Sequence, residues 1–167
     1  MDHACFPSLI GPVTAIGEVL VARRQTLAVA ESCTGGLLAA ALTAVPGSSR
    51  WFEYGLVTYS PAAKQRLLQL PDDLVSPLRI VSEAVALAMA TGVRSLAQAS
   101  IGVGITGIAG PEGGRPDRPV GTVCVGWMAD QGRTRTYVFP GGRDDVRLAA
   151  VAAALAGIQD ILAATTG

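Results

Sequence analysis

A strand, a turn and a helix follow one another in the stretch Ala28-Val29-Ala30-Glu31-Ser32-Cys33-Thr34-Gly35-Gly36 and its flanks. The short apolar run 27–30 predicts a buried strand, and the good helix formers at 37–42 predict a helix. A strand that feeds a helix through such a turn presents hydroxyls and free backbone N–H groups at the helix N-terminus. That end carries a partial positive charge, which suits an anion or a developing oxyanion.

Ser32 and Thr34 stand in this turn, and two kinds of role fit them. Their hydroxyls, beside free N–H groups, are candidates for a nucleophile or for substrate ligands. Ser and Thr are also common N-caps of helices, and spacing alone favours that structural role.

Composition predicts one domain with a substantial core. The chain has 167 residues, of which 50% are hydrophobic and 16% are charged, and its formal net charge is zero. This length suits a single domain, and the high apolar content predicts a homo-oligomer interface that covers apolar surface. Zero net charge without a basic run argues against nucleic acid as a partner.

The sequence also predicts no membrane association. The apolar stretches are judged too short to span a bilayer, and residues 1–3 differ from the basic start of a signal peptide. Cys5, Cys33 and Cys124 are odd in number and lack metal-ligand spacing. This pattern predicts a cytoplasmic protein with reduced thiols, no disulfide framework and no metal site.

Lysine is rare in this chain. Of the 13 basic residues only Lys64 is a lysine, and the single histidine, His3, lies near the N-terminus. A desolvated lysine can lose its proton, whereas an arginine cannot. Lys64 is therefore a candidate general base, and the alternatives are chance and an ordinary exposed lysine.

Alternating patterns along the chain predict the remaining elements. Residues 1–12 are expected to be a loose segment, and residues 13–167 a single domain. Apolar spacing predicts further helices over 13–24, 60–70, 82–96 and 146–164, and strands over 51–59, 100–105, 120–128 and 134–139. The last two strands are expected to form an antiparallel hairpin. This order predicts an α/β fold, a three-layer α/β/α sandwich with a mixed, mostly parallel sheet of about five strands.

A glycine-rich loop, residues 106–114, follows the strand predicted at 100–105. Gly102, Gly104 and Gly107 match G-x-G-x-x-G, but two of them fall inside the strand and no helix follows. We therefore reject a dinucleotide fingerprint. The loop can still present N–H groups to a ligand. Ligands in open α/β sheets bind beyond the carboxyl ends of parallel strands, so this loop and the Ser32 turn are expected to face one site.

Four segments, taken together and in order, carry a family resemblance. They are residues 30–36, 54–64, 107–114 with 118–123, and 139–147. This set resembles the C-terminal domain of the CinA (competence/damage-inducible) family, and the resemblance covers nearly the whole chain from about residue 14. Pro61 stands where the family often has Asn, and Arg118 stands where Lys is usual.

The resemblance implies an activity and a pair of catalytic residues. The stand-alone form of this domain is a nicotinamide-nucleotide amidohydrolase, which converts nicotinamide mononucleotide to nicotinate mononucleotide and ammonia. Such enzymes are Ser/Lys hydrolases without a cofactor. Carried over by motif, Ser32 is the nucleophile and Lys64 is the base. The expected partner is a small pyridine nucleotide.

Other candidate site residues follow from this mechanism. The candidate substrate-binding residues are Glu31, Thr34, Gly35, Gly36, Thr106, Gly107, Ala109, Gly110, Arg143 and Arg147. The N–H groups of residues 34–36 and 106–107 are candidates for the oxyanion hole. Arg143 and Arg147 are candidates for the substrate phosphate, with exposure to solvent as the alternative.

Three further side chains keep open alternatives. Tyr59 is a catalytic candidate through a hydrogen bond to Lys64 or Ser32, or it is a packed strand aromatic. Glu31 orients the turn, recognises the ribose or is a surface carboxylate. Cys33 could replace Ser32 as the nucleophile, although a packing role is preferred. Two other functions compete with an enzyme: a non-catalytic nucleotide-binding module and a structural oligomerisation domain.

Overall fold

Five strands form one mixed sheet in the computed structural model, which describes residues 7–77 and 79–164. The strands are β1 (Leu27–Glu31), β2 (Phe52–Val57), β3 (Ile101–Gly107), β4 (Thr122–Met128) and β5 (Gly132–Val138). Their order in the sheet is β2-β1-β3-β4-β5. The strand β1 pairs in parallel with β2 and β3, and β3, β4 and β5 pair antiparallel. The predicted hairpin is β4–β5.

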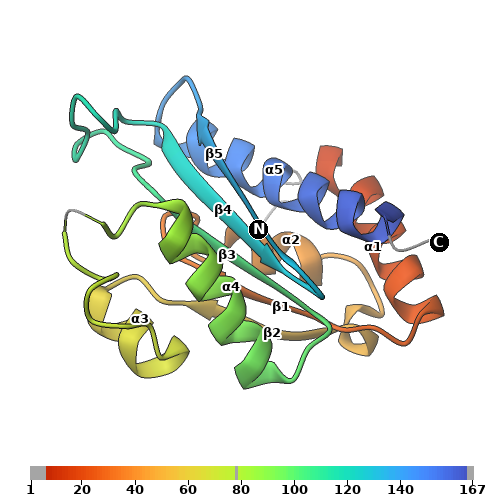
Figure 1. Cartoon of the computed structure of the whole chain (residues 1–167). Coiled ribbons are helices and arrows are strands. Elements are labelled where there is room, and N and C mark those ends of the chain that lie inside the picture. The colour runs from red at the N-terminus through yellow and green to blue at the C-terminus, as the bar shows by residue number, and fades with distance from the viewer. Residues whose placement is uncertain (1–6, 78, 165–167) are drawn as a thin grey trace.

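Helices cover both faces of this sheet (Figure 1). They are α1 (Pro7–Ala22), α2 (Leu37–Thr43), α3 (Pro61–Leu68), α4 (Glu83–Ala97) and α5 (Arg143–Ala164), with a short 3-10 turn at Ser48–Arg50. α1, α2 and α5 lie on one face, and α3 and α4 lie on the other. Val29 of β1 packs into the first layer, while Ala28 and Ala30 pack into the second. The three-layer α/β/α sandwich is confirmed.

The helix α1 begins at Pro7 and not at residue 13, so the expected loose segment is wrong for residues 7–12. Leu9 is buried with Val13 and Ile16 in the core under α5. This burial outweighs the cost of Pro12 inside the helix. Residues 1–6 of the expected loose segment lie outside the described residues.

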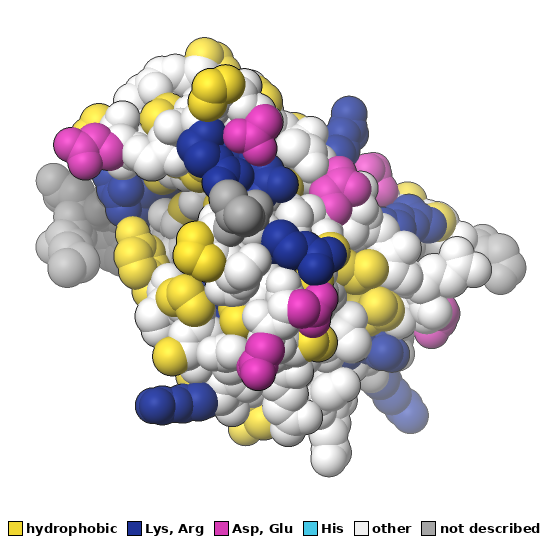
Figure 2. All heavy atoms as spheres, turned by 60° about the vertical axis from the view of Figure 1, so that its left-hand side comes forward, with side chains coloured by type: hydrophobic (Ala, Val, Ile, Leu, Met, Phe, Trp, Pro, Cys, Tyr) yellow, Lys and Arg dark blue, Asp and Glu magenta, His cyan; other side chains and the backbone are white. Residues whose placement is uncertain are grey.

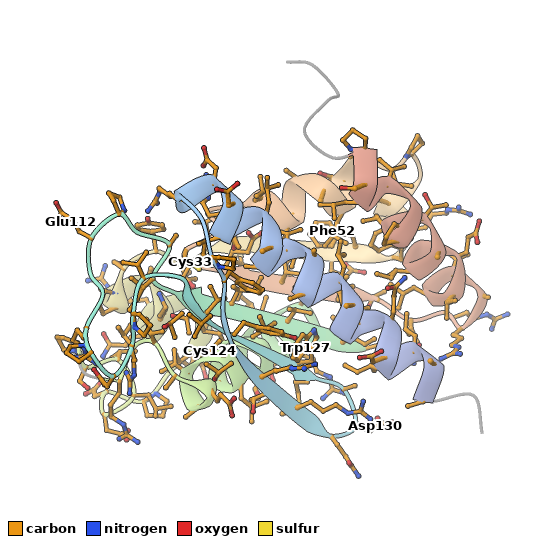
Figure 3. The ribbon with its side chains drawn as sticks, turned by 90° about the horizontal axis from the view of Figure 1, so that it is seen from above. Cys33, Phe52, Glu112, Cys124, Trp127 and Asp130 are labelled. Atoms are coloured by element: carbon orange, nitrogen blue, oxygen red, sulfur yellow. The ribbon has the colours of Figure 1, made fainter. Side chains whose placement is uncertain are left out.

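The helix α5 differs from the sequence-based expectation in another way. By length and composition alone, its 22 residues could cross a membrane. In the fold, its buried residues, among them Val146, Ala150 and Ile158, pack into the core. Trp127 of β4 lies beneath this helix (Figure 3), and its Nε1 donates a hydrogen bond to the Ala154 carbonyl at 3.0 Å. α5 therefore has the contacts of a core helix.

Glycines on β3 and β4 let α4 approach the sheet closely. A Cβ at Gly104 would overlap the Ala86 carbonyl and lie 2.7 Å from Cβ of Met89, and Gly102 faces Ala90 in the same way. After β3 the chain runs through a loop into β4, without a helix. These glycines thus serve helix packing, which agrees with our rejection of a dinucleotide fingerprint.

We expect Gly104→Ala to lower the free energy of unfolding by on the order of 1–3 kcal/mol, because α4 would have to move away from β3. The matched control is Gly11→Ala in α1, where a Cβ would meet nothing within 4 Å. Alanine favours a helix over glycine, so the control should be as stable as the wild type or more so. Urea denaturation measures both. An unchanged midpoint for Gly104→Ala would contradict the close packing.

Candidate active site

The Ser32 turn begins where β1 ends. The Gly35 N–H donates to the Ser32 carbonyl at 3.0 Å. Gly35 and Gly36 have φ values of 60° and 93°, a left-handed conformation that glycine adopts without the penalty of a Cβ. Two successive glycines thus turn the chain from β1 into α2.

Glu31 holds this turn from within the protein. Its side chain is fully buried, and its carboxylate accepts hydrogen bonds from the N–H groups of Gly36 (3.0 Å), Leu38 (3.1 Å) and Ala39 (2.8 Å). It satisfies N–H groups that the first turn of α2 leaves open. Of the three expectations for Glu31, the geometry agrees with orientation of the turn and not with a surface carboxylate or a ribose ligand.

The N–H groups of Gly35 and Gly36 are therefore already occupied, one by Ser32 and one by Glu31. This corrects the expectation that they line an oxyanion hole. The N–H groups of Cys33 and Thr34 instead interact with the Cys33 sulfur, which is a weak acceptor. Because sulfur holds an N–H group only weakly, these two are the candidate oxyanion donors of the turn.

Lys64 reaches the turn from α3. The Ser60 hydroxyl caps this helix by accepting a hydrogen bond from the Ala63 N–H at 3.1 Å. Lys64 is only 1% exposed, and its Nζ lies 3.0 Å from Oγ of Ser32 and 2.6 Å from the Thr58 carbonyl. Burial disfavours the charged amine and lowers the pKa of Lys64 from 10.5 to about 8. The ordinary exposed lysine is thus excluded.

Cys33 lies on the core side of the same turn (Figure 3). Burial raises the pKa of its thiol to about 12, which keeps it protonated at neutral pH. A protonated thiol is a poor nucleophile, so this environment favours the packing role.

A cavity of about 350 Å³ brings most of the candidate residues together. Its lining includes Ser32, Tyr59, Lys64, Thr106, Gly107, Ala109, Gly110 and Arg143. A larger groove of about 810 Å³ lies between α3 and α4, lined mostly by apolar side chains such as Leu67, Leu87 and Leu96. The smaller cavity is the candidate site because the Ser32–Lys64 pair opens into it.

Two lining residues, Ile80 and Val81, lie outside the segments that the sequence predicts to face the site. The Thr106 hydroxyl donates to the Ile80 carbonyl at 2.8 Å and so draws that segment over β3. This bond occupies the hydroxyl expected to bind substrate. Glu112 lies on the outer part of its loop (Figure 3). No local pattern marks a contact between segments so far apart in sequence.

Gly107 lines the cavity, as expected for a ligand-facing loop, but packing within the protein is what requires a glycine at this position. A Cβ there would lie 2.8 Å from the Thr122 carbonyl and 3.0 Å from Sγ of Cys33. Glycine at this position permits close packing between β3, β4 and the Ser32 turn.

Tyr59 and Arg143 contact each other at the cavity. Nη2 of Arg143 donates to the Tyr59 hydroxyl at 3.0 Å, and Nη1 donates to the Gly110 carbonyl at 2.8 Å. Tyr59 is 58% exposed, so it is not a packed strand aromatic, and its hydroxyl bonds Arg143 in this structure in place of the expected Lys64 or Ser32. Among the described residues, the Arg143 side chain bonds only neutral groups, so its positive charge is not offset by a carboxylate there.

Arg147 does not line the cavity. Its Nη2 donates to the Thr34 carbonyl at 3.0 Å, and its Nη1 contacts Asp144 at 3.2 Å. The structure thus separates the two arginines that the sequence assigned to one role.

Figure 2 shows the face that lies at the left of Figure 1. Basic side chains (dark blue) and acidic side chains (magenta) lie close together on this face. The ion pairs of the described loops there include Arg79–Asp73 at 3.0 Å and Arg115–Asp117 at 3.4 Å. Exposed pairs of this kind largely cancel each other's charge.

Within residues 7–77 and 79–164, no group of three His, Cys, Asp or Glu side chains could hold a metal ion.

Known proteins resemble this chain over most of its length. A family model described as the CinA C-terminal domain matches residues 12–162. A putative competence-damage inducible protein from Symbiobacterium thermophilum is 46% identical, over 89% of this chain and 37% of that protein. A CinA-like protein from Syntrophotalea carbinolica is 47% identical, over 85% and 35% respectively. The chain spans about a third of the length of these curated relatives.

Solved structures share the fold along their whole length. A CinA superfamily protein from Klebsiella pneumoniae superimposes with a TM-score of 0.88 and 39% identity, covering 93% of this chain and 98% of that one. A competence/damage inducible protein from Agrobacterium tumefaciens has a TM-score of 0.88 and 35% identity, covering 95% and 98%. The chain belongs to the CinA C-terminal domain family.

Proposed function

We propose that this protein deamidates nicotinamide mononucleotide through a Ser/Lys acyl-enzyme. The observation that carries the proposal is the 3.0 Å contact between Nζ of Lys64 and Oγ of Ser32. It lies at a cavity, and burial there brings the lysine pKa to about 8. A perturbed base next to a hydroxyl is the arrangement that activates a serine. The choice of substrate rests on the family resemblance.

In the first step, neutral Lys64 accepts the proton of Ser32, whose Oγ attacks the carboxamide carbon. The Thr58 carbonyl accepts one hydrogen of the amine at 2.6 Å and so holds Nζ beside Oγ of Ser32. The N–H groups of Cys33 and Thr34 are the donors proposed for the oxyanion, because those of Gly35 and Gly36 are occupied.

In the second half of the reaction, protonated Lys64 gives its proton to the leaving ammonia. It then takes a proton from the water that attacks the acyl-enzyme, and Ser32 is restored. Arg143 is the proposed ligand of the substrate phosphate, because its guanidinium lines the cavity and bonds only neutral groups there.

Ser32→Ala should abolish ammonia release from nicotinamide mononucleotide, because no nucleophile remains beside Lys64. Circular dichroism should show an unchanged fold. Cys33→Ala is the matched control and should retain turnover, since its thiol is protonated. Full activity of folded Ser32→Ala would contradict the mechanism, and saturable ligand binding without ammonia release by the wild type would indicate a non-catalytic module.

Lys64→Arg and Lys64→Met should both lower kcat/KM by on the order of a hundredfold or more, because neither side chain can act as the base. In the wild type, kcat/KM should rise with pH and level off above about pH 8, as Lys64 loses its proton. Rates measured from pH 6 to 10 test both expectations. Near-normal rates for Lys64→Arg would remove the lysine from the base role.

The lowered pKa of Lys64 also predicts a pH-dependent stability that does not depend on the substrate. Between about pH 8 and 10.5 the unfolded chain binds this proton and the folded chain does not, so stability increases with pH. Relative to Lys64→Met, the wild-type free energy of unfolding should rise by roughly 3 kcal/mol over that range. Parallel pH dependence in the two proteins, measured by urea denaturation, would show that Lys64 is not perturbed.

A further inference from the structure

Arg147 connects the C-terminal helix to the Ser32 turn. Its Nη2 donates a hydrogen bond of 3.0 Å to the Thr34 carbonyl, which lies 113 residues earlier in the chain. The Leu37 N–H donates to the same carbonyl at 3.2 Å. The guanidinium also lies 3.5 Å from the position of a Cβ on Gly35, an ordinary van der Waals distance, so it packs directly beside this glycine.

The surroundings of Arg147 differ from those of an exposed arginine. Its side chain is 26% exposed, and Nε is buried without a hydrogen-bond partner among the described residues. The Thr34 hydroxyl is likewise buried without such a partner. Buried polar groups that lack partners cost free energy. The contact between Arg147 and the Ser32 turn therefore costs free energy of unfolding, which a contact made only for stability would avoid.

This contact acts on the part of the turn that the mechanism uses. The Thr34 residue contributes its N–H to the proposed oxyanion donors, and its carbonyl is the atom that Arg147 holds. Glu31 anchors the following N–H groups, of Gly36, Leu38 and Ala39, from the sheet side. Arg147 is thus the side chain from the opposite layer that fixes the same turn.

We propose that Arg147 is a positioning residue, which holds the Thr34 peptide so that the turn keeps its oxyanion donors and Ser32 in reactive geometry. This inference rests on the proposed function. Arg147 does not line the cavity, so we expect no contact between its side chain and the substrate. Its loss should therefore slow the chemical step and leave substrate binding in place.

The test compares Arg147→Met and Arg147→Lys with the wild type, using ammonia release from nicotinamide mononucleotide. For Arg147→Met we expect kcat to fall about tenfold to a hundredfold with KM nearly unchanged, since small misplacements of reacting groups have effects of this size. Arg147→Lys keeps a donor of similar reach and should recover part of kcat. The pH at which the rate levels off should stay near 8, because Lys64 is not altered.

Arg23→Met is the matched control. Nη1 of Arg23 donates to the Leu162 carbonyl at 2.8 Å, a contact of the same kind between distant elements, but far along α5 from Arg147. Its kcat should stay at the wild-type value even if its unfolding midpoint falls. If Arg147→Met does not fold, Arg147→Gln takes its place, because its shorter amide remains polar and cannot span to Thr34.

A second readout separates the inference from the proposed function. An aryl fluorophosphonate should label Ser32 of the wild type, since its P=O oxygen needs the same donors as the oxyanion, and should label Arg147→Met more slowly. A wild type that neither reacts with this probe nor releases ammonia would overturn the proposed function. A reactive wild type with equal kcat and equal labelling in Arg147→Met would overturn the positioning role alone.

Discussion

A buried amine within 3.0 Å of a serine hydroxyl is the constraint that the rest of the site serves. Burial of a charged lysine costs free energy, so the fold has to offer Lys64 a place where the neutral form is preferred. The Ser60 cap starts α3 directly after β2, which puts Lys64 in the second turn and over the end of β1. The Thr58 N–H donates to the Glu31 carbonyl at 2.8 Å and ties the two strand ends together.

The charges around the turn change how the site can bind an anion. A helix N-terminus ordinarily attracts anions, but the Glu31 carboxylate already occupies that position at α2. Its negative charge offsets the partial positive charge that the sequence predicts for a ligand. Under the proposed function, anion binding would fall to Arg143, which lines the cavity from the start of α5, and to the N–H groups ahead of Gly35.

Local patterns predicted the elements well and the contacts between distant elements poorly. Helix caps such as Ser60 and Ser82, and the β4–β5 hairpin, depend on neighbours in sequence, so the sequence alone could identify them. The partner of Tyr59 and the position of Arg147 depend on residues 84 and 113 positions away, for which no periodicity exists. The prolines at positions 7 and 12 led to the expectation of a loose segment, whereas Pro7 begins α1 and burial of Leu9 outweighs the cost of Pro12.

A pKa of about 8 lets Lys64 act as the proposed general base only if the bound substrate does not raise that pKa. One unit below its pKa about a tenth of a base is neutral, so at pH 7 the free site is mostly protonated. The pyridinium ring of nicotinamide mononucleotide carries a positive charge, which beside Lys64 would lower the pKa, while the substrate phosphate would raise it. Arg143 at the cavity would offset the phosphate charge. If nicotinamide mononucleotide binds with its phosphate at Arg143, the positive charge of its pyridinium ring would then favour the neutral form of Lys64.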